Sequence, residues 1–268
     1  MTYGSPSKQM RGEHGEGGPS SMLLHHNGHL MDKALRKVAE FNNQDQYAVQ
    51  WIQAELERIQ QMPGASRLFR RIASASDKGQ LDDYLAEVRY ALIFAGLEFQ
   101  VEIEPFGSKG PDLGVSRDGQ SASVEVMRFN KVYPGPPILD LENDNLLLPE
   151  YGNPPRDIRK AAEKIQAKFR QIGNEQAIIA IWNDEEELEE LEVAAAVNFM
   201  RQDAYRNVLA LPDGLLFILY GSNAKHEAGQ KQLYCFPLRY PMQPYQVAWQ
   251  QELDSSLVYT LIRRALAA

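Results

Sequence analysis

The chain is short of cysteine, of long apolar runs and of basic charge, and each shortage excludes a class of protein. Cys235 is the single cysteine among 268 residues, so neither an internal disulfide nor a thiolate zinc site is expected. No apolar run reaches the roughly 18 residues of a membrane span. Residues 1–28 are rich in Gly, Ser, His and Pro and lack the apolar centre of a signal peptide. We therefore expect a disordered tail and a cytoplasmic protein.

The charge balance and the missing loop motifs narrow the function further. The net charge of −8 argues against a protein that coats nucleic acid without specificity, although a local basic groove can still form. The chain has no Walker-type phosphate loop, no Gly-x-Gly-x-x-Gly and no Gly-x-Ser-x-Gly elbow. These absences remove the common signatures of nucleotide-binding proteins and serine hydrolases.

Hydrophobic periodicity predicts an alternation of helices and strands. Helical spacing covers 30–62 with a break near Asn42-Asn43, and further helices are expected at 65–75, 80–95, 156–172, 185–201 and 254–266. Strands are expected at 98–104, 111–116, 121–128, 177–182, 215–220 and 232–236, with a long proline-rich loop at 129–155. On the 65–75 helix, Arg67, Arg70 and Arg71 are expected to be exposed.

This order predicts an α/β fold, or α+β, with a mixed central β-sheet flanked by helices. We divide the chain into four parts. They are a tail at 1–28, an N-terminal helical extension at 29–75, a core at 76–184, and C-terminal α/β elements at 185–268 that pack on the core.

The strands at 111–116 and 121–128 bring two acids together. Asp118-Gly119 is a strong hairpin signal, and a turn there places Asp112 directly opposite Glu125. Directly opposed residues have Cβ atoms about 4.5–5.5 Å apart, and like charges in that position repel. A divalent cation between them removes the conflict, and Mg²⁺ favours one or two carboxylates with water and phosphate oxygens. The backbone carbonyl of Val126 is a further candidate ligand.

These residues carry a family resemblance. The order α-β-β-β-α-β over about 80–183, with Pro111-Asp112 on one strand and Glu125-x-Met127 on the next, resembles the PD-(D/E)xK, or restriction endonuclease-like, nuclease superfamily. The resemblance implies that Asp112 and Glu125 bind the metal and that Glu87, on the preceding helix, supports it. It implies a Mg²⁺- or Mn²⁺-dependent endonuclease, a hydrolase of phosphodiester bonds in DNA or, less readily, RNA.

Met127 departs from the pattern, because the family has a lysine there that activates water or stabilises the phosphate. Three interpretations remain open. The metal alone activates water, or cleavage is lost and binding is kept, or another residue supplies the cation. The candidates for that cation are Lys109, Arg128, Lys164 and Lys168. Lys109 is favoured by the register, which places its neighbour Gly110 opposite Met127.

The helix at 156–172 carries a basic stripe, formed at four-residue intervals by Arg156, Lys160, Lys164 and Lys168. Such a face can follow phosphates and bind DNA; it can equally be a solvated helix face. Two other functions stay open: a catalytically degenerate domain that binds nucleic acid or a protein partner, and a structural adaptor. The adaptor follows if the hairpin register is slipped by one residue. A homodimer is compatible with the sequence.

Overall fold

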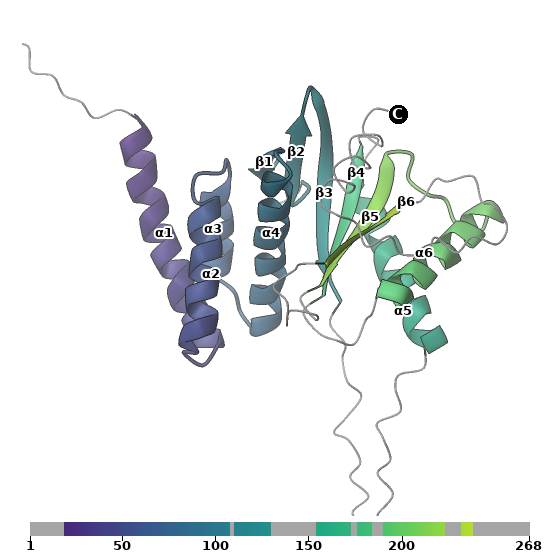
Figure 1. Ribbon diagram of the computed structural model, residues 1–268, viewed down its shortest axis with the longest axis horizontal. Coiled ribbons are helices and arrows are strands. Elements are labelled where there is room, and N and C mark those ends of the chain that lie inside the picture. Colours follow the sequence, from purple (N-terminus) through teal and green to yellow (C-terminus); the bar gives the residue numbers. More distant parts are fainter. Residues whose placement is uncertain are drawn as a thin grey trace, which may run out of the picture.

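A six-stranded mixed sheet lies between two layers of helices in the computed structural model, which describes residues 19–107, 110–129, 154–172, 176–183, 190–222 and 232–237 (Figure 1). The strands follow their chain order across the sheet. They are β1 (Gln100–Ile103), β2 (Leu113–Arg117), β3 (Gln120–Arg128), β4 (Ala177–Asn183), β5 (Leu215–Ser222) and β6 (Gln232–Pro237). The pairs β3/β4 and β4/β5 are parallel, and the other pairs are antiparallel. The expected mixed α/β architecture is confirmed.

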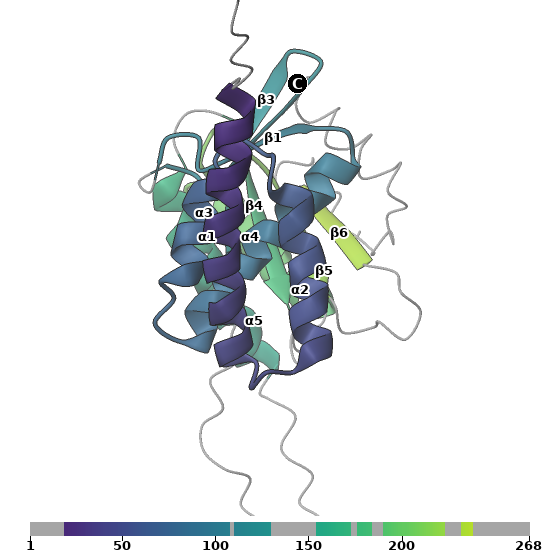
Figure 2. The same cartoon turned by 90° about the vertical axis from the view of Figure 1, so that its left-hand side faces the viewer.

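The helices cover both faces of this sheet. Helix α4 (Lys78–Gly96) packs on one face, and α5 (Pro154–Lys168) and α6 (Glu190–Tyr205) pack on the other. A 3₁₀ turn (Phe169–Gln171) continues α5. Three more helices, α1 (Pro19–Phe41), α2 (Gln46–Ile59) and α3 (Ala65–Ala73), form an outer layer beyond α4, seen in front in Figure 2. No helix among the described residues has the length and apolarity needed to cross a bilayer.

Two apolar cores result, one on each face. Val124, Val126 and Trp182 pack toward α4, whereas Ile179 and Ile181 pack toward α5 and α6. Strand β4 is buried along its whole length because both of its faces are covered. This explains why its sequence is an unbroken apolar run rather than an alternating one.

The hairpin between β2 and β3 has the predicted turn and register. Asp118 has φ 53° and Gly119 has φ 80°, the two positive angles that a type I′ turn requires. The turn pairs Arg117 with Gln120, and the ladder continues to Leu113 opposite Val124. One further step of this register places Asp112 opposite Glu125. The alternative with a slipped register, on which the adaptor interpretation depended, is wrong.

The N-terminal boundary differs from the expectation. Helix α1 begins at Pro19, so residues 19–28 of the expected tail are helical. Proline suits the first position of a helix, because its missing N–H has no partner there, and the following Met-Leu-Leu segment favours helix. The side-chain amide of Asn27 also donates to the carbonyl of Gln60, 3.0 Å away, which ties α1 to the end of α2.

The outer helices are joined to the sheet where β1 ends. The N–H of Ile103 donates to the carbonyl of Pro63 at 2.8 Å. Gly64 has φ 85°, and a Cβ atom there would lie 1.8 Å from the carbonyl oxygen of Ile103. Only glycine fits this approach and this backbone angle. The linker between α2 and α3 therefore packs directly against the sheet.

Several expected segments lie outside the described residues: the tail before residue 19, most of the 129–155 loop, the acidic start of the 185–201 helix, and the final helix at 254–266. The remaining expected elements are present with shifted ends. Helix α4 begins at Lys78, two residues before the expected start, because Asp77 is its N-cap: the Asp77 side chain accepts from the N–H of Gln80.

Candidate metal centre

Two carboxylates meet where β2 begins and β3 approaches its end. Asp112 immediately precedes β2, and Glu125 lies in β3 with a residual exposure of 5%. The N–H of Val126 donates to Asp112 Oδ2 at 2.8 Å, which fixes the orientation of the Asp112 carboxylate. The predicted pair is therefore held in place by the backbone of the neighbouring strand. The N–H of Val126 contributes this contact, whereas the sequence suggested a role for its carbonyl.

Both carboxyl groups are harder to ionise than usual. Burial raises the pKa of Glu125 to about 7, nearby Asp112 adds to the rise, and Lys168 opposes it. Burial also raises the pKa of Asp112, and the hydrogen bond from Val126 is the main opposing influence. A buried carboxylate and a half-buried one that repel each other gain most from a cation between them. Hard oxygen donors of this kind fit Mg²⁺ or Mn²⁺.

Lys168 supplies a cation at this pair. Its Nζ lies 3.3 Å from Glu125 Oε2, and its side chain is 24% exposed. The packing of α5 explains the contact: Ala161, Ala162 and Ile165 are buried against the sheet, and Lys168 follows Ile165 by about one helical turn. Met127 instead packs against the core beneath α5 and α6. The sequence predicted Lys168 both as a candidate cation for the site and as part of the basic stripe that binds phosphates.

The other candidate cations lie elsewhere. Lys164 is exposed, with its Nζ 5.5 Å from the centre of the Phe129 ring. Arg128 pairs with Asp82 on α4 at 3.1 Å. Lys160 is exposed on α5. Lys109 and the side chain of Arg156 lie outside the described residues. The structure therefore brings Lys168, and not Lys164, to the carboxylate pair.

Glu87, which the resemblance places in support of the metal, is paired with an arginine. Its carboxylate is 4% exposed and accepts two hydrogen bonds from the guanidinium of Arg71, at 2.7 and 2.9 Å. Burial raises the pKa of Glu87 to about 8, Asp112 adds to the rise, and Arg71 opposes it. No three His, Cys, Asp or Glu side chains in the described part of the chain are grouped to hold a metal. Any ion at Asp112 and Glu125 would complete its shell with water and substrate oxygens.

Arg71 also positions Asp112 through a second acid. Its guanidinium donates to Glu104 at 2.5 Å, and the N–H of Glu104 donates to the carbonyl of Asp112 at 2.8 Å. Arg67 bonds the carbonyls of Ile103 and Glu104, both at 2.7 Å. Arg67 and Arg71 are half-buried, with 38% and 30% of their side chains exposed, so the expectation that they are exposed holds only in part, whereas Arg70 is exposed as expected. Their spacing of one helical turn on α3 is the sequence signal for a shared inward face.

Asp83 is a further acid near the Asp112–Glu125 pair, and the sequence alone did not indicate it. It lies one turn before Glu87 on α4, at the edge of the site with its side chain 54% exposed, and partial burial raises its pKa. The negative charge of Asp112 also raises the pKa of Asp83, whereas the positive charges of Lys168 and Arg71 lower it. The i,i+4 spacing of Asp83 and Glu87 places both on one side of the helix and could have indicated it.

Comparisons of the chain with family models, curated proteins and solved structures return no match.

Proposed function

We propose that the protein is a Mg²⁺- or Mn²⁺-dependent nuclease of the PD-(D/E)xK type, which hydrolyses phosphodiester bonds of DNA or, less readily, RNA. The observation that carries the proposal is the convergence of Asp112, Glu125 and Lys168 at one point of the sheet. Two acids and one amine are the residue types of that family's motif. The amine here comes from α5 in place of position 127.

The topology supports the same assignment. The elements from α4 to β4 run in the order α-β-β-β-α-β. Strands β1, β2 and β3 are antiparallel, and β4 lies parallel to β3. Helices α4 and α5 cover opposite faces of the sheet. This is the arrangement expected of a restriction endonuclease-like core, with α1–α3 and the elements after β4 as additions.

Each residue has a role that follows from its chemistry. Asp112 and Glu125 would hold the divalent ion, which when bound supplies a polarised phosphoryl oxygen and a more acidic water. The amine of Lys168 can donate to the attacking water or to a phosphate oxygen and stabilise the charge that develops there. The N–H of Val126 keeps Asp112 oriented. Exposed Lys160 and Lys164 on α5 can contact flanking phosphates.

A second candidate function draws on Met127. A domain that has lost the motif lysine can retain nucleic-acid binding, or bind a protein partner, without cleavage. In that case the contact between Lys168 and Glu125 is a structural ion pair that neutralises a buried carboxylate. The two functions differ in one outcome, which is metal-dependent hydrolysis.

The deciding experiment incubates the full chain with plasmid DNA, single-stranded DNA and RNA in Mg²⁺, Mn²⁺ or EDTA. Wild type is compared with Glu125→Ala and with Glu163→Ala, a control on the exposed side of α5. Cleavage that needs metal and is lost only in Glu125→Ala supports the nuclease. Salt-sensitive binding with no cleavage under any condition supports the degenerate domain and overturns the nuclease.

A further inference from the structure

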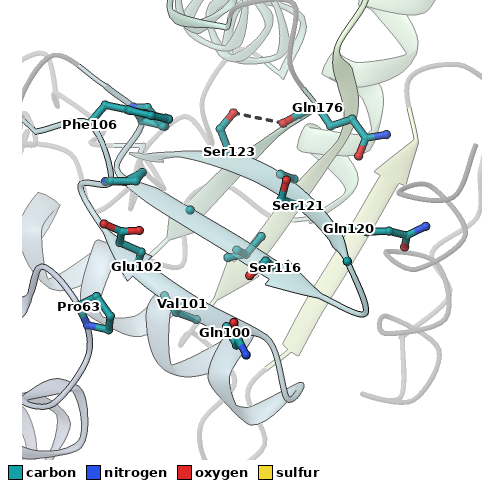
Figure 3. Close-up of a pocket in the computed structure, with 16 residues that line it drawn as sticks. Pro63, Gln100, Val101, Glu102, Phe106, Ser116, Gln120, Ser121, Ser123 and Gln176 are labelled. Atoms are coloured by element: carbon teal, nitrogen blue, oxygen red, sulfur yellow. Dashed lines mark hydrogen bonds between the residues drawn. The ribbon is translucent and has the colours of Figure 1, made fainter.

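On the face that carries α5 and α6, the described helices leave the part of the sheet formed by β1, β2 and the start of β3 uncovered. On β1, β2 and β3, alternate residues such as Val101, Val115 and Val124 are buried against α4. The residues between them point away from α4 and are exposed or half-buried: Gln100, Glu102, Gly114, Ser116, Ser121 and Ser123. They line a trough of about 910 Å³, shown in Figure 3 with Phe106 at one end and Gln120 near the hairpin turn. This volume lies within the range of ligand sites, about 300–1,000 Å³.

The trough leads to the carboxylate pair. Side chains alternate along a strand, so Ser121, Ser123 and Glu125 lie on the same side of β3. On the neighbouring strand, Pro111 lines the trough and is followed directly by Asp112. A chain lying in the trough would therefore reach the metal centre at its next position. The lining of the trough thus ends one residue before Asp112 and two residues before Glu125.

The lining has the chemistry of a base-binding surface. Among its 16 described residues, Glu102 is the only one with a charged side chain, so the trough offers no cation for phosphates. It offers hydroxyls and amides from Ser116, Ser121 and Gln120, which can both donate and accept hydrogen bonds. Phe106 is 70% exposed at its rim. Exposed aromatic rings beside neutral polar groups bind unpaired bases by stacking and edge contacts.

We propose that this trough binds the unpaired bases of a single-stranded nucleic acid, with one base stacked on Phe106. The adjoining phosphodiester would then lie at Asp112 and Glu125. The cleavage part of this inference depends on the proposed nuclease function, whereas the binding part does not. Single strands are the fitting substrate because the bases of a duplex do not expose their faces to an aromatic ring.

The test measures binding of the full chain to fluorescent oligonucleotides by anisotropy in EDTA. The ligands are a single strand, an abasic strand of equal length and a duplex. Phe106→Ala should weaken single-strand binding by about 5- to 140-fold, the range expected for loss of one stacked base, and leave abasic binding unchanged. Phe106→Tyr should retain binding, because it keeps the ring. Tyr205→Ala, an equally exposed aromatic on α6, is the matched control and should bind like wild type.

Three results would overturn the inference. They are undetectable single-strand binding by wild type, equal loss of both ligands in Phe106→Ala, and duplex binding as tight as single-strand binding. Hydrolysis of bis(p-nitrophenyl) phosphate, which has no base, separates this inference from the proposed function. Tyr205→Ala should hydrolyse it as wild type does, whereas Glu125→Ala should not. Base-dependent binding without any hydrolysis would reject the nuclease and leave the binding surface standing.

Discussion

The Nζ atom of Lys168 lies 3.3 Å from Oε2 of Glu125, which joins the end of α5 to β3 across 43 positions of sequence. This contact places an amine beside a candidate metal ligand in a protein that has methionine at the usual position of that amine. It makes the catalytic proposal testable by moving or removing a single side chain.

Replacing Lys168 with methionine should lower the turnover of DNA cleavage by about 10²- to 10³-fold, because a charge-stabilising donor is lost from the site. Glu125 would remain buried and free to bind metal. Single-turnover cleavage measures the effect, and Lys164→Met is the matched control on the same helix, expected to lose only a few fold. If both variants lose cleavage activity equally, the basic residues of α5 act only through nonspecific phosphate contacts.

Adding a lysine at position 127 should partly rescue the Lys168→Met variant. Met127 shares the side of β3 that carries Glu125, so a lysine there can bring its amine to the same place. We expect at least about a tenfold recovery of turnover in the double variant, on the scale of a restored donor. Arg128→Lys, on the opposite side of β3, is the position control. If the folded double variant is not rescued, an amine at position 127 cannot replace the amine of Lys168 in the reaction.

Stability without metal should depend on pH through Glu125. Its pKa is raised from 4.5 to about 7 on folding, so the folded protein holds the extra proton between these values. Stability from this group is fully present below pH 4.5 and is lost as pH rises to about 7. Glutamine does not ionise, so the Glu125→Gln variant does not lose this stability. Between pH 4.5 and about 7 in EDTA, its melting temperature should therefore rise relative to that of wild type.

At pH 8, magnesium should make wild type melt at a higher temperature than Glu125→Gln, the reverse of the order expected in EDTA. Wild type then binds the ion with an ionised Glu125 and should melt at a higher temperature, whereas Glu125→Gln should not respond. Scanning calorimetry at pH 5 and pH 8, with and without Mg²⁺, measures all four conditions. A metal-induced rise that is the same in both proteins would place the ion elsewhere.

Arg71 should contribute more to stability than other partly exposed arginines, because it pairs with two buried acids. Its removal leaves Glu87 without its bidentate partner and leaves Glu104 with Arg67 alone. Arg71→Met should lower the free energy of unfolding by about 1–3 kcal/mol, the cost of leaving a buried carboxyl group without its hydrogen-bond partner. Arg70→Met, at the exposed neighbouring position, should change it by less than about 0.5 kcal/mol. Urea unfolding of both variants provides the comparison, and similar values would refute the role of Arg71.

The sequence predicted those features that local chemistry determines. The Asp118-Gly119 turn determined the hairpin register, and from it the Asp112–Glu125 pair, because a two-residue type I′ loop leaves only one pairing. The helices and β4 followed from periodicity and from continuous burial.

Features that depend on long-range packing were not predicted. Arg71 meets acids 16 and 33 positions away, and nothing near it in the sequence indicates those partners. The choice of Lys168 over Lys164 depends on which side of α5 packs on the sheet, and the buried Ile165 decides it. Glu87 occupies the place that the family resemblance indicated, but its partner comes from an outer helix that lies beyond the matched region.

The close approach of Gly64 to Ile103 has a practical consequence for anyone who trims this protein. A fragment that starts at residue 76 would match the recognisable core, yet it would lose Gly64, Arg67 and Arg71 together. The end of β1 would then be frayed, and two acids buried in the full chain would face solvent. The smallest useful version of the protein therefore begins well upstream of the proposed nuclease core.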